Sequence, residues 1–244
     1  MTETAELRQS KITDCSMLSI NQPYFFPNIG YFSLLCNSQI HVFLDSVKMR
    51  KKSWITRNSF CLKHQLVAIP IQQLSQNRNI NEHLVCNRIA ARDSFIKTFT
   101  GLNGTQPFLK EAIELVHYSF ETKSEGLTIA ELNQKSTIKL CELMDLNVKF
   151  KKQSDFTDLT GKKETLLINI CKNLDFQCYL NLQGGEFLYT KGSFLKQGIE
   201  LHFVDNRQMK KAIGQEFNIS ILSLFAKYGL NMLVDTLCEH STYN

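Results

Sequence analysis

Short apolar runs alternate along this chain with segments in which apolar residues recur every three or four positions. Residues 17–22 and 40–45 are apolar runs with β-branched or aromatic content, which is typical of buried strands. The apolar pattern of residues 31–38, between these runs, is that of a helix. Strand, helix and strand in succession form a β-α-β unit, so the pattern predicts a parallel sheet.

The pattern changes after the second predicted strand. Residues 59–63 and 65–71 predict two further strands with very little chain between them, so a hairpin or an antiparallel edge is expected. Residues 72–81 are rich in Gln, Asn and Ser, which predicts an unstructured polar loop. Such a loop could be mobile over a site.

The middle of the chain, about residues 89–145, has the apolar spacing of helices, and alternation then resumes. Helices are expected over residues 90–100, 107–119, 128–144, 162–174, 219–227 and 231–238, and strands over residues 147–150, 178–181 and 199–204. We therefore predict an α/β fold: a mostly parallel Rossmann-like sheet with flanking helices and an antiparallel edge or hairpin. Residues 16–240 are expected to form a single domain, preceded by a loose extension over residues 1–15.

The loop after the first predicted strand has an unusual composition. Residues 21–32 hold two of the chain's four prolines, one glycine and five aromatic residues, which describes a rigid turn. In open α/β proteins, ligands bind outside the carboxyl ends of the strands. We therefore expect Gln22 and Tyr24 to lie at one sheet edge with Asp45, and Gly184 and Gly185 to lie nearby. The alternative is a turn that only seals the core.

The composition is that of an ordinary globular protein. The chain has 244 residues, of which 43% are hydrophobic and 21% charged. No run approaches the length of a membrane span, and residues 1–14 have no apolar core of a signal peptide, so a cytoplasmic protein is expected. The eight cysteines form no Cys-x-x-Cys pair and are expected to be reduced core residues. The histidines show no metal-ligand spacing, so no metal is expected.

The formal net charge of +5 is modest, but its distribution is uneven. Lys48, Arg50, Lys51, Lys52 and Arg57 fall within ten residues that contain no acid. Such a cluster favours an anionic partner, whether a diphosphate, the acidic face of a carrier protein or nucleic acid. A solvated basic loop is the alternative.

Three motifs resemble those of a known family. QPYFxPxIGYF begins at Gln22, DxV begins at Asp45 and WxxRN begins at Trp54. Together they are similar to the signature of the WbqC-like proteins, which are encoded among bacterial surface-polysaccharide functions. The resemblance extends from about residue 18 to residue 229.

This resemblance implies a transferase that attaches an acyl or aminoacyl group, such as glycine, to the amine of a nucleotide-linked amino sugar. The donor would be a phosphopantetheine thioester on a carrier protein, with no bound cofactor and no nucleic-acid partner. The chain departs from the family pattern at His41, Ser46, Lys48 and Thr56, and a Ser-Gly pair is lost near residues 181–183. Two alternatives therefore stay open, a non-catalytic module that binds a nucleotide sugar or a carrier, and a nucleotidylyl-transferase-like enzyme.

Three residues are candidates for the chemistry of amide formation. Asp45 could orient or deprotonate the sugar amine, although capping the following loop is its structural alternative. Alternation places His41 on the same strand face as Asp45, where it is either a base or a satisfied core histidine. Tyr24 could donate a hydrogen bond to an oxyanion. The oligomeric state is not predicted.

Other residues are candidates for substrate binding. Arg57 and Asn58 offer a planar fork and an amide for phosphate oxygens or a base edge, and Trp54 could stack on a ring. The same residues could instead brace the loop. The remaining candidates for contact with the nucleotide sugar are Gln22, Lys51, Lys52, Gly184 and Gly185.

Overall fold

The computed structural model describes residues 15–63 and 65–244, so the extension expected over residues 1–15 lies, except for Cys15, outside the described residues. The strands are β1 (Met17–Asn21), β2 (Ile40–Phe43), β3 (Arg57–Ser59), β4 (Leu66–Ala68), β5 (Lys149–Lys152), β6 (Cys178–Asn181), β7 (Glu200–Asp205) and β8 (Thr242–Tyr243). The α-helices are α2 (Ile29–Cys36), α3 (Arg88–Asn103), α4 (Leu109–Phe120), α5 (Ile129–Leu143), α6 (Glu164–Asn173), α7 (Lys191–Leu195), α8 (Arg207–Ile213) and α9 (Ile221–His240). Short 3-10 turns are η2 (Ile80–Glu82), η3 (Gln153–Asp155), η4 (Gln183–Gly185) and η5 (Gly214–Asn218).

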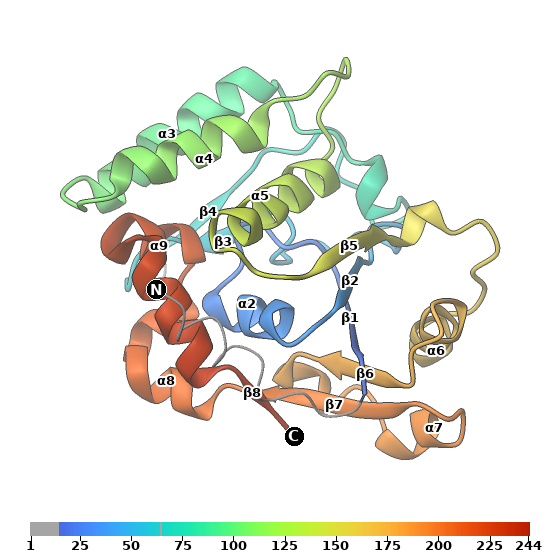
Figure 1. Ribbon diagram of the computed structural model, residues 1–244. Coiled ribbons are helices and arrows are strands. Elements are labelled where there is room, and N and C mark those ends of the chain that lie inside the picture. The colour runs from blue at the N-terminus through green and yellow to red at the C-terminus, as the bar shows by residue number, and fades with distance from the viewer. Residues whose placement is uncertain (1–14, 64) are drawn as a thin grey trace.

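A six-stranded sheet forms the centre of the protein, in the order β5-β2-β1-β6-β7-β8 (Figure 1). Its pairs are parallel except for the antiparallel pair of β7 with β8. The predicted mostly parallel α/β fold is thereby confirmed. Because β5, β2, β1 and β6 are consecutive parallel neighbours, their carboxyl ends share one edge of the sheet.

Helices cover both faces of the sheet, as the apolar composition of its strands requires. Leu18 and Ile20 of β1 pack on one face with residues of α6 and α7, and Met17 packs on the other face with Leu34 of α2. Beyond α2, the helices α3, α4, α5 and α9 share a large core with the loop that follows β1. Figure 1 shows α6 and α7 on one side of the sheet and α2, α8 and α9 on the other.

The hairpin predicted after the second strand exists, but it is shorter than expected and forms a separate two-stranded sheet. Arg57 pairs with Ala68 and Ser59 with Leu66, so the first strand ends where residues 59–63 were expected to begin one. The polar loop 72–81 is also more ordered than predicted, since η2 begins at Ile80. Lys48 pairs with Asn79 across this loop, and the Lys48 Nζ donates to the Asn77 carbonyl at 2.7 Å.

Several elements of the described chain were not predicted, among them α7, α8, η3, η5 and β8. Each short helix buries few side chains, Phe194 in α7 and Met209 in α8. An amphipathic pattern needs several buried positions at helical spacing, which segments of five and seven residues do not supply. Tertiary contacts therefore determine these elements more than local pattern does.

The last helix, α9, contains a break that explains why the sequence pattern predicts two helices there. Gly229 has a φ of 76° and a ψ of 171°, outside the helical region. In the described part of the chain, α9 is the one helix long and apolar enough to cross a membrane by length and composition. However, 56% of its most apolar window is buried inside the protein, as in the core helix of a soluble protein.

The expectation that all cysteines are reduced core residues is wrong for the described chain. Cys15 and Cys178 form a disulfide, and Cys36, Cys86 and Cys238 are exposed, whereas Cys141 and Cys171 are buried. The bonded pair is separated by 163 residues. It meets because Met17 of β1 lies beside Cys178 of β6, a neighbour relation that cysteine spacing does not reveal.

Candidate functional site

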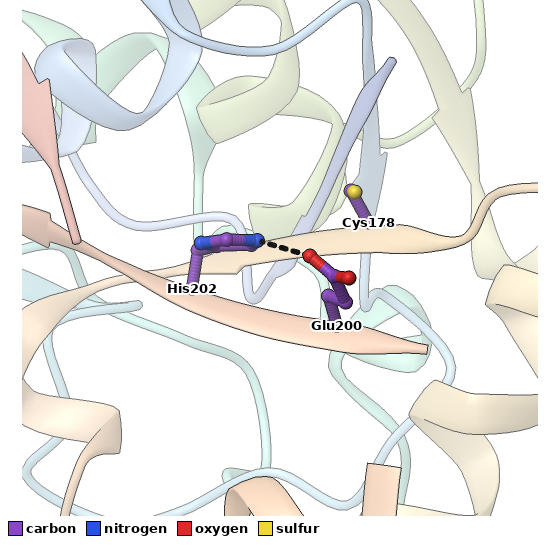
Figure 2. Close-up of side chains that lie close together, drawn as sticks. All are labelled: Cys178, Glu200 and His202. Carbon is purple, nitrogen blue, oxygen red and sulfur yellow. Dashed lines mark ion pairs between the residues drawn. The ribbon is translucent and has the colours of Figure 1, made fainter. Parts of the chain in front are cut away.

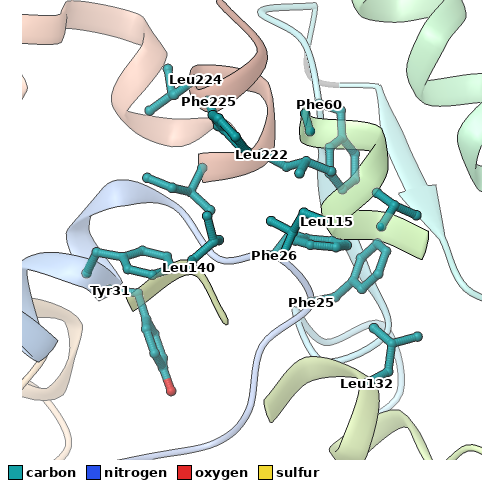
Figure 3. Packing of buried hydrophobic residues seen from close by; sticks show 14 of the residues in the cluster. Phe25, Phe26, Tyr31, Phe60, Leu115, Leu132, Leu140, Leu222, Leu224 and Phe225 are labelled. Carbon is teal, nitrogen blue, oxygen red and sulfur yellow. The ribbon is translucent and has the colours of Figure 1, made fainter. Parts of the chain in front are cut away.

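The loop that joins β1 to α2, residues 22–28, is part of the hydrophobic core. Phe25 and Phe26 have no exposed surface, and both rings contact Phe95 at centroid distances of 5.2 and 6.0 Å. Phe25 also meets the edge of Phe60 at 5.8 Å. Figure 3 shows the two rings pointing into the cluster that includes Phe60 and Leu115. The loop is therefore rigid because its aromatic residues are anchored in the core.

Buried polar side chains hold the backbone of this loop. The Asn58 amide donates to the carbonyls of Phe25 at 3.0 Å and Phe26 at 2.7 Å, and the Ser220 hydroxyl also donates to Phe26. The Asn133 amide donates to the Pro23 carbonyl at 2.9 Å. Backbone carbonyls removed from water need such donors. Asn58, expected as a ligand of the substrate, thus has its amide donors occupied by the protein, which matches the bracing alternative.

Gln22 and Tyr24, the two residues of this loop that are candidates for the site, keep part of their surface exposed. The Gln22 carbonyl accepts from the Tyr31 hydroxyl at 3.2 Å, and the Tyr24 ring lies 5.7 Å from the Tyr31 ring. Burial raises the pKa of Tyr24, Tyr189 raises it further, and the Arg50 cation partly offsets the rise. The Tyr24 hydroxyl is therefore protonated at neutral pH and available as a hydrogen-bond donor.

Tyr189 and Arg50 extend this arrangement to two neighbouring loops. Burial raises the pKa of Tyr189, the Glu164 carboxylate raises it further, and Arg50 lowers it. Tyr24 follows β1, Arg50 follows β2 and Tyr189 follows β6. We call Tyr24, Arg50 and Tyr189 the edge cluster, because each belongs to a loop after the carboxyl end of an adjacent parallel strand.

The two glycines after β6 differ in their surroundings. Gly185 is buried, and a Cβ there would lie 2.7 Å from the Asn181 amide nitrogen, so close packing requires a glycine. Gly184 is exposed, with open space where its Cβ would be. Of the pair, Gly184 therefore offers room for an approaching ligand.

Asp45 lies past the end of β2, at the expected sheet edge, but it faces the protein. It is 2% exposed. One carboxylate oxygen accepts from the Ser154 backbone N–H at 3.0 Å, and the other accepts from the Ser154 hydroxyl at 2.7 Å and from Gln134 at 3.4 Å. In this structure Asp45 joins the end of β2 to η3 and α5, as a capping residue would.

His41 is fully buried inside the sheet. Its Nδ1 is 2.8 Å from the Ser19 hydroxyl and its Nε2 is 2.9 Å from the Tyr31 hydroxyl, so both ring nitrogens have partners. Burial lowers the pKa of His41 to about 3. This placement matches the satisfied core histidine that the sequence left open, with the ring neutral at physiological pH.

The basic cluster surrounds a turn on the surface. Arg50, Lys51 and Lys52 are exposed, and Trp54 is 50% exposed. The Arg57 guanidinium donates to the Lys52 carbonyl at 2.6 Å, while its buried Nε has no hydrogen-bond partner in the described chain. Arg57 thus shapes the turn, and its neighbours present cations and an indole ring to solvent.

Two grooves lie elsewhere, and no predicted site residue lines either. One, of about 300 Å³, lies between β4 and α3 and is lined by residues such as Val67 and Ala90. The other, of about 500 Å³, lies among α4, α5 and α9, with Tyr118 and Phe225 in its lining.

The sequence pattern singled out Tyr24 but missed Tyr189, and it placed Arg50 only within the basic cluster. The signal for Tyr189 was its position in the segment after the Gly184-Gly185 turn. That segment also exposes two large apolar side chains, Phe187 at 93% and Leu188 at 70%. Exposed apolar side chains beside a glycine turn are typical of a surface that binds a ligand or a partner protein.

Comparisons with curated proteins and with solved structures found no significant match. The model of the WbqC-like protein family matches residues 22–232, which include the whole loop after β1, the basic cluster and Tyr189. Membership is consistent with a role in polysaccharide biosynthesis. Because the match covers most of the chain, this protein belongs to the WbqC-like protein family.

Proposed function

We propose that this protein transfers an acyl or aminoacyl group, such as glycine, from a carrier-protein thioester to the amine of a nucleotide-linked amino sugar. The observation that supports the proposal is the edge cluster, in which Tyr24, Arg50 and Tyr189 follow three adjacent parallel strands and Arg50 lowers the pKa of both tyrosines. The cations at Lys51 and Lys52 and the indole of Trp54 lie in the same loop as Arg50. Loops at the carboxyl ends of parallel strands are where open α/β proteins bind ligands.

Each part of this surface has a role in the proposed reaction. Arg50, with Lys51 and Lys52, neutralises the diphosphate, and Trp54 stacks on the base. The sugar amine attacks the thioester carbonyl, so a C–N bond forms, the C–S bond breaks, and the amine proton passes to the departing thiolate. Tyr24, protonated at neutral pH, donates to the oxyanion that develops at the carbonyl.

The test measures the mass of the nucleotide amino sugar during incubation with the protein and a glycyl- or acyl-loaded carrier. We expect a mass gain equal to the transferred group. Tyr24→Phe keeps the ring and removes the donor, so it should lower the turnover rate by about 10²-fold. Tyr118→Phe on the exposed face of α4 is the matched control and should leave the rate unchanged.

A second function is favoured by a specific observation, the burial of both predicted acid–base residues. His41 is enclosed and Asp45 accepts hydrogen bonds from Ser154 with both oxygens. A module that binds a nucleotide sugar without transforming it would need neither residue at the surface. Binding of the nucleotide sugar with no mass gain for any loaded carrier would contradict the transferase and support the module.

A further inference from the structure

A second polar group lies at the opposite, amino-terminal end of the sheet strands. Cys178 begins β6, Glu200 begins β7, and His202 follows two residues later on β7. Their potential ligand atoms all lie within 4.8 Å of one another. Figure 2 shows the three side chains on the two neighbouring strands, with the Glu200 carboxylate between the cysteine and the imidazole.

The register of the sheet explains why these side chains meet. Cys178 is paired with Glu200, so the two side chains share one face of the sheet. His202 lies two residues beyond Glu200 and therefore points to the same face. Its Nε2 is 3.5 Å from the nearest Glu200 oxygen.

The fourth member of the group is Cys15, which is bonded to Cys178. It stands two residues before β1, whose first residue, Met17, is the register neighbour of Cys178. Two sulfurs, one imidazole and one carboxylate thus lie near the starts of three adjacent strands, the Cys15 sulfur through its bond to Cys178. These are the donor types that Zn²⁺ prefers, and four of them complete a tetrahedral site.

The His202 imidazole carries an independent indication of a ligand. Its Nε2 is buried and makes no hydrogen bond in the described chain, and the Glu200 carboxylate, 3.5 Å away, faces it as an ion-pair partner. The other side of the ring is held by Tyr243, whose ring meets it edge-on at 5.7 Å. An imidazole nitrogen and a carboxylate oxygen that face each other without a hydrogen bond, beside a sulfur, are suited to hold a cation between them.

We propose that the reduced protein binds one zinc ion through Cys15, Cys178, His202 and Glu200. In a tetrahedron with ordinary Zn–S, Zn–N and Zn–O bonds, neighbouring ligand atoms are about 3.3–3.8 Å apart. The ligand atoms of Cys178, Glu200 and His202 are up to 4.8 Å apart, so rotation of these side chains brings them towards that range. Cys15 is free to turn towards them once its bond to Cys178 is reduced. The histidine spacing in the sequence does not reveal this site, because its ligands come from separate strands.

The zinc-bound state and the disulfide exclude each other, because zinc binds thiolates. A dithiol reductant supplies two electrons and two protons, becomes a disulfide itself, and leaves Cys15 and Cys178 as thiols. Zinc then displaces the two thiol protons. The metal replaces the disulfide as the link between the start of β1 and the start of β6 when the surroundings are reducing.

The first experiment measures zinc retained by the full-length protein after desalting. The protein is reduced with a phosphine, or oxidised, and then mixed with one equivalent of zinc chloride. We expect about one zinc per reduced chain and none per oxidised chain. A reduced chain that retains no zinc, or an oxidised chain that retains as much as the reduced one, overturns the proposal.

Variants locate the site. His202→Ala and Cys15→Ser should each weaken zinc binding by more than about 100-fold, since loss of a ligand exceeds the effect of loss of its supporting contacts. His240→Ala is the matched control, because His240 lies 3.6 Å from Glu239 in a similar pair that lies outside this group. Unchanged zinc affinity in both ligand variants, with a folded circular dichroism spectrum, contradicts the proposal.

Cobalt(II) gives a readout that does not depend on stability. Bound to the reduced wild type it should produce thiolate-to-metal charge-transfer absorption, which Cys15→Ser should reduce and His240→Ala should not. Bound cobalt without that absorption would place the metal away from the cysteines and contradict the proposal.

Discussion

Single buried amides determine the shape of the loop after β1. The Asn58 amide supplies donors to two consecutive carbonyls, those of Phe25 and Phe26, and the Ser220 hydroxyl supplies a second donor to Phe26. Phe26 has a φ of 40°, in the left-handed region that favours glycine, so its conformation depends on such outside contacts.

We therefore expect Asn58→Ala to destabilise the protein by about 1–3 kcal/mol, because the buried Phe25 carbonyl loses its donor and the Phe26 carbonyl keeps only that of Ser220. Asn173→Ala, on the exposed end of α6, should change the free energy of unfolding by less than about 0.5 kcal/mol. Urea unfolding followed by circular dichroism measures both. Equal stability of the two variants would contradict the bracing role of Asn58.

His41 makes stability depend on pH. Its folded pKa of about 3 is below its ordinary value of 6.5, so the unfolded chain binds a proton where the folded chain does not. Its contribution is fully present above pH 6.5 and is lost as the pH falls towards 3.

Comparison with His41→Gln isolates this effect from the carboxylates that titrate in the same range. The variant should be less stable at pH 7.5, and its free energy of unfolding should fall less steeply than that of the wild type between pH 6.5 and pH 4. His117→Gln, on the exposed face of α4, should keep the wild-type slope. The measurement is urea unfolding at a series of pH values, and parallel slopes for wild type and His41→Gln would count against a neutral buried histidine.

At the scale of elements, the break in α9 lies at Gly229, where both the backbone angles and the surrounding space favour glycine. The φ and ψ angles of Gly229 belong to a region that is essentially restricted to glycine, and a Cβ there would lie 2.9 Å from the Phe108 ring. Gly101 is the opposite case, since it lies within α3 and nothing surrounds the position of its Cβ.

Alanine at these two positions should therefore act with opposite sign. Gly229→Ala should destabilise the protein by at least about 1–3 kcal/mol, and Gly101→Ala should stabilise it by about 0.5–1 kcal/mol. Thermal unfolding distinguishes the two directions. A stable Gly229→Ala protein would mean that α9 can run through the break.

Elements with a buried periodic face could be predicted from the sequence, and those without one could not. The strands β1, β2 and β6 are almost entirely buried, so their apolar runs were visible. Helix α8 buries one side chain, Met209, and left no pattern to detect. The hairpin was predicted to exist, but its register depends on tertiary contacts, such as those of Asn58 with the loop after β1. Local sequence does not reveal these contacts.

At the scale of the whole molecule, strand order decides which residues meet. The sequence indicated the loops after β1, β2 and β6 as neighbours, and the sheet order places these strands side by side. It did not identify which side chains face outward. His41 on β2 and Asp45 beyond its end both face the interior. Tyr189 was missed because its loop shows no helical or strand period.

The central claim is that the edge cluster, with its adjoining cations, binds a nucleotide-linked amino sugar, a claim that the transferase and the binding module share. Isothermal titration with a uridine-diphosphate amino sugar tests it most directly. We expect binding by the wild type and by Lys97→Gln, a change on the exposed face of α3, with a dissociation constant about tenfold higher for Arg50→Gln. No binding by the wild type, or equal affinity of Arg50→Gln and the wild type, would contradict the account.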